Sequence, residues 1–279
     1  MDLREALNAV SDVIVNRPPP LREFDQIYMK AADMLIQADH VSKWFTGRDV
    51  VFIGDGDALA LSLVHLHRTK NIDLGPRSVH VLDFDERVVN SILRFAERYE
   101  YEGSVTASLY NVAEPLPREF QGAFSAFYTN PPFGASNEGR SVSAFIRRGF
   151  EATAADARCC IAIADYEELA WCDVVLARTQ DEMLRAGFVV AEMIPRLHRY
   201  HLDDLPDLTS CSLVGRRRAY LRPPEPSQPL TDEERAQFYG RNDPLRARYV
   251  RDLTNGGKLA SKNHVLESFR PPAGAHGKA

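Results

Sequence analysis

The sequence lacks several features that would place the protein in a familiar class. It has no apolar run approaching the roughly 20 residues of a membrane span. Its four cysteines contain no C-x-x-C pair, and no histidine spacing suggests a metal site, so we expect reduced thiols and no metal. The first residues are acidic and have no signal-peptide core, which favours a cytoplasmic location. We therefore expect a protein that acts on a small molecule away from membranes.

The chain also lacks an excess of basic residues, since its net charge is −5. From Arg216 onward there are 13 Lys/Arg and 7 Asp/Glu, so this part carries +6 and the preceding residues carry −11. An acidic body argues against nucleic-acid binding and suits a cationic substrate. The alternative is that the acidic surface serves solubility alone.

Short apolar segments alternate with helical patterns between Val50 and Val214. This alternation predicts an α/β fold with a doubly wound, mostly parallel sheet of the Rossmann-like, methyltransferase type. The last two apolar segments predict an antiparallel hairpin at the sheet edge. The expected organisation is an N-terminal helical segment (1–46), a Rossmann-like catalytic domain (47–222), and a C-terminal helical appendage with a flexible tail (223–279).

A glycine-rich acidic turn follows the first predicted strand. It is not G-x-G-x-x-G, which argues against a dinucleotide. The next strand ends in Asp83, where a carboxylate can bind both ribose hydroxyls. Asp83 could instead cap the following helix, a role that suits Asp85 better, and Asn111 is either an adenine contact or a turn residue. The expected contacts of a nucleoside-type cofactor are Gly54, Asp55, Gly56, Asp57, Asp83, Phe84 and Asn111.

The tetrapeptide Asn130-Pro131-Pro132-Phe133 follows another predicted strand. The two prolines make a rigid bend, and the residue before proline is held extended. The Asn130 side-chain oxygen and neighbouring carbonyls can then accept hydrogen bonds from one amine nitrogen. We therefore expect group transfer to nitrogen, with Asn130, Pro131 and Phe133 at the reacting centre.

These segments together resemble the catalytic domain of the branched-chain polyamine synthases, the bis(aminopropyl)spermidine synthases. The resemblance covers roughly residues 15 to 215 and lies in Arg17-Pro18-Pro19-Pro20, Phe24-Asp25-Gln26-Ile27-Tyr28, the Gly54–Asp57 turn, Leu82-Asp83-Phe84-Asp85-Glu86-Arg87, Pro115-Leu116-Pro117 and Thr129-Asn130-Pro131-Pro132. It implies transfer of an aminopropyl group from decarboxylated S-adenosylmethionine to a polyamine-type amine, with release of methylthioadenosine. The chain departs from the family at Gly56, Asn111 and Asn130, where the family has Asp.

An amide at position 130 cannot accept the proton that an alkylammonium must lose before it attacks. Another acid would have to serve. The candidates are Asp165, Glu167 and Glu168 after the next strand, Glu138 in the inserted loop, and Asp203, Asp204 and Asp207 in the hairpin turn, and Asp165 is the expected catalytic carboxylate. A polar insertion at residues 134–140 is expected to be flexible and able to close over a ligand. Further candidate substrate contacts are Tyr28, Asp25, Glu138, Tyr166, Asp203 and Asp204.

Three functions remain open at this point. Aminopropyl transfer from decarboxylated S-adenosylmethionine is favoured by the resemblance, and N-methyl transfer from S-adenosylmethionine by the Asn-Pro-Pro-Phe motif. The third is a catalytically inactive nucleoside-binding homologue. The sequence leaves a homodimer as one alternative for the assembly.

Overall fold

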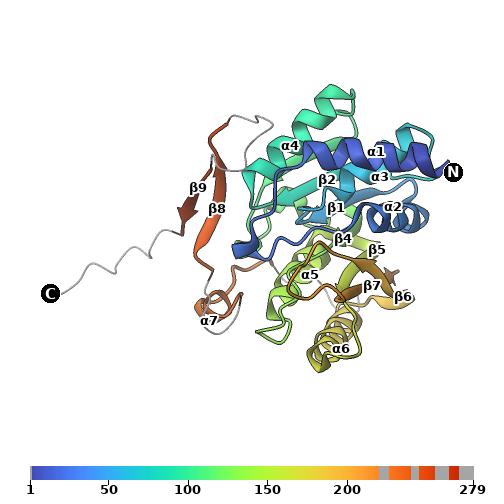
Figure 1. Ribbon diagram of the computed structural model, residues 1–279. Coiled ribbons are helices and arrows are strands. Elements are labelled where there is room, and N and C mark those ends of the chain that lie inside the picture. Colours follow the sequence, from blue (N-terminus) through green and yellow to red (C-terminus); the bar gives the residue numbers. More distant parts are fainter. Residues whose placement is uncertain (1, 220–225, 240–244, 255–263, 270–279) are drawn as a thin grey trace.

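The computed structural model describes residues 2–219, 226–239, 245–254 and 264–269. Its centre is a seven-stranded sheet in the order β3-β2-β1-β4-β5-β7-β6 (Figure 1). β1 to β5 pair in parallel, whereas β7 runs antiparallel to both β5 and β6. This confirms the predicted methyltransferase-type sheet and its closing hairpin. The strands are β1 (Asp49–Ile53), β2 (Ser78–Asp83), β3 (Val105–Leu109), β4 (Phe124–Thr129), β5 (Thr153–Ala164), β6 (Val189–Arg199) and β7 (Thr209–Arg217).

Helices cover both faces of the sheet. One apolar cluster joins the sheet to four helices, and a second cluster joins the opposite face to two more. The first group is α1 (Leu3–Asn16), α2 (Ala31–Phe45), α3 (Leu59–Arg68) and α4 (Glu86–Arg98), and the second is α5 (Arg140–Ala152) and α6 (Ala170–Arg185). Two short 3-10 turns, η1 (Arg22–Phe24) and η2 (Arg118–Phe120), lie in connecting segments.

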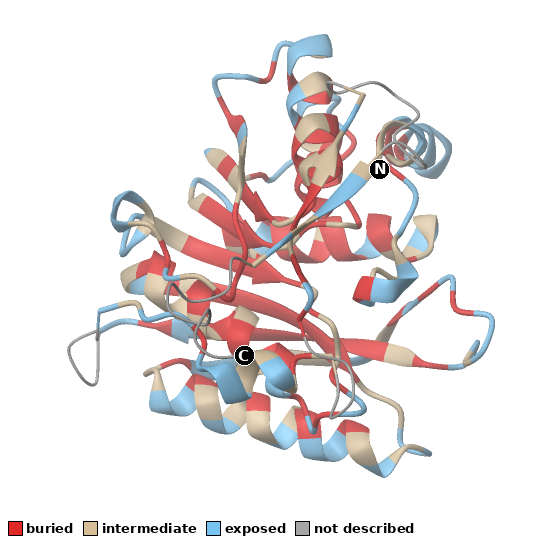
Figure 2. Ribbon diagram, turned by 90° about the vertical axis from the view of Figure 1, so that its left-hand side faces the viewer, coloured by how far each residue is buried: buried red, intermediate tan, exposed pale blue. Residues whose placement is uncertain are grey.

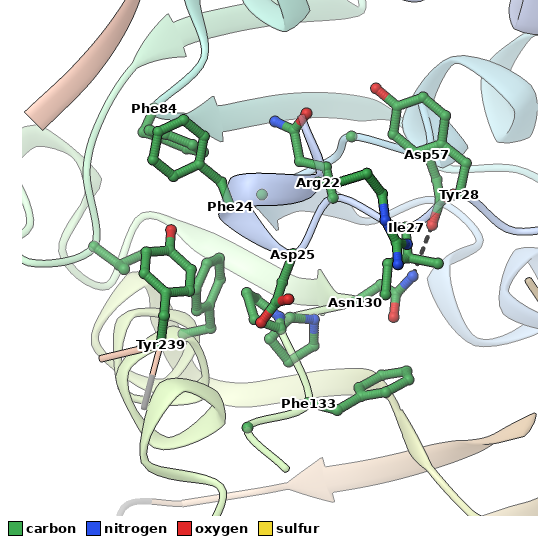
Figure 3. Close-up of a pocket in the computed structure, with 18 of the residues that line it drawn as sticks. Arg22, Phe24, Asp25, Ile27, Tyr28, Asp57, Phe84, Asn130, Phe133 and Tyr239 are labelled. Atoms are coloured by element: carbon green, nitrogen blue, oxygen red, sulfur yellow. Dashed lines mark hydrogen bonds between the residues drawn. The ribbon is translucent and has the colours of Figure 1, made fainter. Parts of the chain in front are cut away.

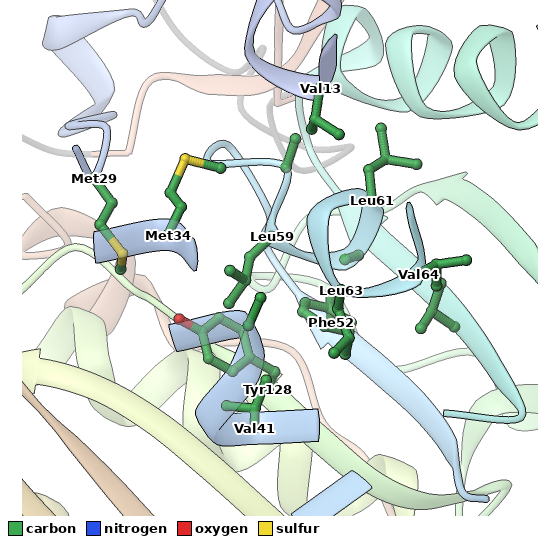
Figure 4. Packing of buried hydrophobic residues seen from close by; sticks show 14 of the residues in the cluster. Val13, Met29, Met34, Val41, Phe52, Leu59, Leu61, Leu63, Val64 and Tyr128 are labelled. Carbon is green, nitrogen blue, oxygen red and sulfur yellow. The ribbon is translucent and has the colours of Figure 1, made fainter. Parts of the chain in front are cut away.

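The strand sequences explain this arrangement. Val50 and Phe52 of β1 face the first cluster, whereas Val51 and Ile53 face the second, because successive strand side chains point to opposite sides. Figure 4 shows Phe52 packed with leucines of α3, and Figure 2 shows that the buried residues concentrate on the central strands. A sheet buried on both faces requires the continuous apolar runs that the sequence contains.

Two helix boundaries depart from the helical pattern of the sequence because of pairing with distant strands. The pattern before α2 starts at Tyr28, but the helix begins at Ala31, because Met29 forms a β-bridge with Tyr200 and the Lys30 amide donates to the Arg199 carbonyl. A helix expected to continue to residue 155 ends at Ala152, and β5 starts at Thr153. In both places pairing with a distant strand overrides the local helical pattern.

The C-terminal segment, expected to be helical, contains strands as well. The expected capping box is present, since Thr231 and Glu234 bond reciprocally at the start of α7 (Asp232–Ala236). Beyond it, β8 (Ala247–Asp252) and β9 (His264–Ser268) form a two-stranded antiparallel sheet, and β8 packs beside α4 (Figure 1). Tyr249 and Val250, an aromatic and a β-branched residue, are buried in β8 and favour a strand there. The expected start of the linker at 223–225 and the expected tail at 270–279 lie outside the described residues.

Candidate active site

A cavity of about 270 Å³ opens at the carboxyl ends of β1, β2 and β4 (Figure 3). This is the edge at which doubly wound sheets bind ligands. Segments far apart in the sequence meet there, including the extended stretch before α2 and the segment after α7. The lining residues fall in 22–28, 54–57, 82–84, 110–112, 130–135, 200–208 and 238–239, together with Phe145, Trp171 and Leu245.

The turn after β1 brings backbone close to the cavity. Gly54 has φ +72°, and a Cβ added there would lie 2.9 Å from the Phe145 ring. Asp55 accepts hydrogen bonds from the amides of Leu59 (2.8 Å) and Ala60 (3.0 Å), so its carboxylate holds the start of α3. Burial raises the pKa of Asp55 well above its ordinary value. Asp55 therefore shapes the turn and lines the cavity, and its contact with a cofactor stays a prediction.

Asp83 lies at the end of β2, beneath the same cavity. Its two carboxylate oxygens accept from the amides of Asp55 and Asp85, each at 2.9 Å. Burial and the nearby Asp85 raise the pKa of Asp83 to about 7. Asp85, not Asp83, caps α4 by accepting from the Arg87 amide, in agreement with the sequence analysis. Asp83 is thus a fixed acidic group at the position expected for ribose binding.

Three aromatic rings gather near the end of β2. Phe84 packs edge-on against Phe24, with ring centroids 5.3 Å apart, and Tyr239 lies 6.1 Å from Phe24 (Figure 3). All three rings line the cavity. They provide an apolar wall of the kind that holds a flat purine base.

Asn111 lines the cavity, but its side chain is bound to other parts of the chain. Its Nδ2 donates to the carbonyls of Ala247 (3.4 Å) and Arg248 (2.6 Å), and its Oδ1 accepts from the Ala113 amide. Asn111 therefore anchors β8 next to the cavity. An adenine contact by this residue stays a prediction.

Asn130 is held in one orientation by Asp57. The Asn130 Nδ2 donates to Asp57 Oδ2 at 2.7 Å, shown by the dashed line in Figure 3. Asp57 Oδ1 accepts from the Met29 amide at 2.7 Å, and Arg17 lies 3.9 Å away. Burial raises the pKa of Asp57. The bond from Nδ2 fixes the orientation of the amide, and Oδ1, on the side away from Asp57, can accept a hydrogen bond from a ligand.

The segment after β4 has no regular secondary structure, and Pro131 and Phe133 line the cavity with Asn130. Phe133 packs edge-on against Tyr200, with ring centroids 5.7 Å apart. The Tyr200 Oη lies 3.4 Å from Asn130 Oδ1. Apolar residues continue this side of the cavity: Trp171, Leu202, Leu205 and Leu208.

Three of the expected substrate contacts also reach the cavity. Tyr28 is buried, donates its hydroxyl proton to the Pro18 carbonyl, and lies under the Arg17 guanidinium. Asp25 and Asp204 lie at the exposed rim, where Asp204 is 3.4 Å from Arg22. These positions allow contact with a bound cation, a role that stays a prediction.

Four candidates do not line the cavity. Asp165 accepts from the Arg196 amide and thereby ties the end of β5 to β6. Glu138 pairs with Arg178 at 3.8 Å, and Tyr166 donates to Glu168. Asp203 is exposed. The structure thus gives Asp165 a local structural contact, and its proposed catalytic role has no geometric support.

The sequence analysis missed Tyr200 and the residues after α7 that line the cavity, Phe238, Tyr239 and Leu245. Phe24 and Gln26 also line the cavity and were not predicted as site residues. The predicted contacts Asp25 and Tyr28, in the same motif, indicated from the sequence that this stretch belongs to the site.

The insertion at 134–140, expected to be flexible, is bonded to the segment after α7. The Asn137 Nδ2 donates to Ser141 and to the carbonyls of Gln237 (3.0 Å) and Phe238 (2.5 Å). Ser136 donates to the Tyr239 carbonyl. The insertion therefore positions Phe238 and Tyr239 in the cavity wall.

Two features are absent from the described residues: a metal-binding cluster and a membrane-spanning helix. Across 2–219 and the later described ranges, no group of three His, Cys, Asp or Glu is placed to hold a metal ion. None of the helices described is long and apolar enough to cross a membrane. All four cysteines are buried and form no disulfide.

Comparison with known proteins identifies related sequences. Residues 5–220 match the family described as the branched-chain polyamine synthase A C-terminal domain. An N(4)-bis(aminopropyl)spermidine synthase of Thermus thermophilus is 30% identical over 192 residues, which cover 66% of this chain and 50% of that protein. The Methanocaldococcus jannaschii protein of the same name is 28% identical over 162 residues, covering 56% and 41%. The chain thus spans half or less of these relatives.

A solved structure shares the fold. The branched-chain polyamine synthase from Thermus thermophilus superposes with a TM-score of 0.64 at 25% identity, covering 82% of this chain and 69% of that one. That structure is a complex with N4-aminopropylspermidine and 5'-methylthioadenosine.

Proposed function

Because the chain belongs to the branched-chain polyamine synthase A C-terminal domain family, we propose that it is an aminopropyltransferase. The donor is decarboxylated S-adenosylmethionine, the acceptor is an amine nitrogen of a polyamine-type molecule, and methylthioadenosine is released. The ligands named for the Thermus thermophilus structure support both halves of this assignment.

The observation that carries the proposal is the charge of the cavity wall. Five of the described lining residues are acidic: Asp25, Asp55, Asp57, Asp83 and Asp204. Arg22 is the one basic side chain in that set, and it pairs with Asp204 at the rim. The ammonium tail of a decarboxylated donor suits such a wall, whereas the carboxylate of intact S-adenosylmethionine would need a cation or several N–H donors. N-methyl transfer is therefore the less favoured alternative.

In the proposed reaction the acceptor nitrogen attacks the methylene carbon bonded to the sulfonium. The new C–N bond forms as the C–S bond breaks, and sulfur keeps the bonding electrons as a neutral thioether. The incoming ammonium first loses its proton to water, since Asn130 cannot accept it. Asn130 contributes by aiming the nitrogen, and the aromatic faces of Phe133 and Tyr200 favour the positive charge of donor and acceptor.

Calorimetric titration tests the donor assignment directly. Decarboxylated S-adenosylmethionine, S-adenosylmethionine and methylthioadenosine would be titrated in parallel into the same preparation. We expect the decarboxylated donor to bind at least tenfold more tightly than S-adenosylmethionine, the equivalent of about 1.4 kcal/mol. Tighter binding of S-adenosylmethionine would contradict the proposal and favour methyl transfer, and binding without turnover would favour the inactive homologue.

A further inference from the structure

A buried hydrogen-bond chain begins at the acceptor side of the cavity and runs into the sheet. Tyr200 Oη lies 2.7 Å from Ser210 Oγ, and Ser210 Oγ lies 2.8 Å from His198 Nδ1. His198 Nε2 lies 2.7 Å from Gln37 Oε1. The side chains of Ser210, His198 and Gln37 are fully buried, so water does not supply alternative partners. Which atom donates in each of these hydrogen bonds can therefore be derived step by step, starting from Gln37.

At that end, Gln37 Nε2 donates to Ser212 Oγ (3.2 Å) and Cys160 Sγ (3.4 Å), which leaves Oε1 facing His198. A carbonyl oxygen can only accept, so His198 Nε2 carries the proton. Burial lowers the pKa of His198 to about 3, so the ring is neutral and Nδ1 must accept. The hydroxyl of Ser210 therefore donates to His198.

Because Ser210 donates its one hydroxyl hydrogen to His198, its Oγ can only accept from the Tyr200 hydroxyl. The Tyr200–Asn130 oxygen separation of 3.4 Å is longer than an ordinary O–H···O bond, whereas 2.7 Å to Ser210 is ideal. Asn130 Nδ2 donates one of its two hydrogens to Asp57, which holds the amide with its oxygen on the opposite side. Asn130 Oδ1 and Tyr200 Oη thus lie side by side as two acceptors, and neither carries a proton toward the cavity.

We propose, resting on the function above, that this pair of oxygens selects primary amino groups as the attacking nitrogen. A primary amine can give one N–H to each oxygen while its lone pair points at the donor carbon. A secondary amine leaves one oxygen without a partner, and a tertiary amine leaves both. The product is a secondary ammonium that keeps its proton, formed as the C–S bond breaks and methylthioadenosine leaves.

The neutral amide of Asn130 also bears on which nitrogen of a polyamine is modified. Their name, N(4)-bis(aminopropyl)spermidine synthase, places two aminopropyl groups on an internal nitrogen. A carboxylate stabilises a cationic nitrogen through charge, whether or not it carries hydrogens, whereas a neutral amide requires an N–H. Asn130 therefore favours elongation at the end of a polyamine over branching in its middle.

Three diamines that differ only in N-methylation test the proposal. Methylthioadenosine release from decarboxylated S-adenosylmethionine would be measured with 1,4-diaminobutane, its N,N'-dimethyl derivative and its N,N,N',N'-tetramethyl derivative. We expect kcat/KM to fall about tenfold or more from the primary to the secondary amine, and turnover of the tertiary amine to be undetectable. With spermidine, mass spectrometry should find the linear product. A branched product, or equal rates on all three amines, would overturn the proposal while leaving aminopropyl transfer intact.

The variant Tyr200→Phe removes one of the two oxygens and keeps the ring that packs on Phe133. We expect kcat/KM for the primary amine to fall about tenfold and that for the secondary amine to stay within about twofold of the original enzyme. Tyr128→Phe is the matched control, because Tyr128 is an equally buried tyrosine that does not line the cavity. Equal losses for both amines would contradict the assignment. If no amine supports release from the decarboxylated donor but S-adenosylmethionine is consumed, the proposed function itself fails.

Discussion

At the scale of single residues, three acids at the ends of β1 and β2 have different tasks. Asp55 holds the start of α3, Asp57 orients Asn130, and Asp83 is fixed by two backbone amides. The sequence placed all three at one site, because strand-end acids in a doubly wound sheet meet at one edge. The sequence alone does not distinguish their roles, because each role depends on which N–H groups donate to that carboxylate in the folded protein.

The raised pKa of Asp83 predicts pH-dependent ligand binding. If the carboxylate accepts ribose hydroxyls, only its ionised form binds well, and with a pKa of about 7 that form is lost as the pH falls. We expect the Kd for methylthioadenosine to rise about tenfold from pH 8 to pH 6. Calorimetry at several pH values checks this, and in Asp83→Asn the dependence should disappear. A flat profile in the unmodified protein would argue against Asp83 as the ribose ligand.

Tyr200 illustrates a contact that the sequence could not reveal. It follows β6, which lies three positions from β4 in the sheet, yet it reaches Asn130 at the end of β4. The contact exists because residues beyond β6 pair with the stretch before α2, through the Met29–Tyr200 bridge. Nothing in the local pattern around Tyr200 specifies that pairing, whereas the Asn-Pro-Pro-Phe bend is specified locally by its prolines.

At the scale of elements, the 134–140 insertion and the segment after α7 form one unit. Asn137 joins them, and its side chain is 5% exposed. We predict that Asn137→Ala lowers the free energy of unfolding by about 1 to 3 kcal/mol, because buried carbonyls lose their donor. The Kd for methylthioadenosine should rise as well, since Phe238 and Tyr239 lose their support.

Asn71 provides the control for this prediction. It is also buried, at 9% exposure, and its side chain bonds to Thr69 at the end of α3, away from the cavity lining. Chemical denaturation and calorimetry on both variants separate the two effects. Weaker binding in Asn71→Ala to the same extent as in Asn137→Ala would show that loss of stability alone explains the change.

At the scale of the whole molecule, the uneven charge bears on substrate capture. The residues before Arg216 carry a net charge of −11, and they supply nearly all of the cavity. We expect the KM for a cationic polyamine to rise several-fold between about 50 and 500 mM salt, because screening weakens the attraction. The Kd for methylthioadenosine, which is uncharged, should change little over the same range. Salt-independent KM values would show that the charge serves another purpose.

The span of the cavity wall along the chain has a consequence for synthesis in the cell. The wall begins at Arg22 and is completed by Leu245. A ribosome must therefore deliver at least 245 residues of this sequence before the donor has a finished place to bind. A chain that stops before Phe238 would lack three of the described lining residues, Phe238, Tyr239 and Leu245. Donor binding should therefore be weaker in a chain cut before Phe238 than in one that extends past Leu245.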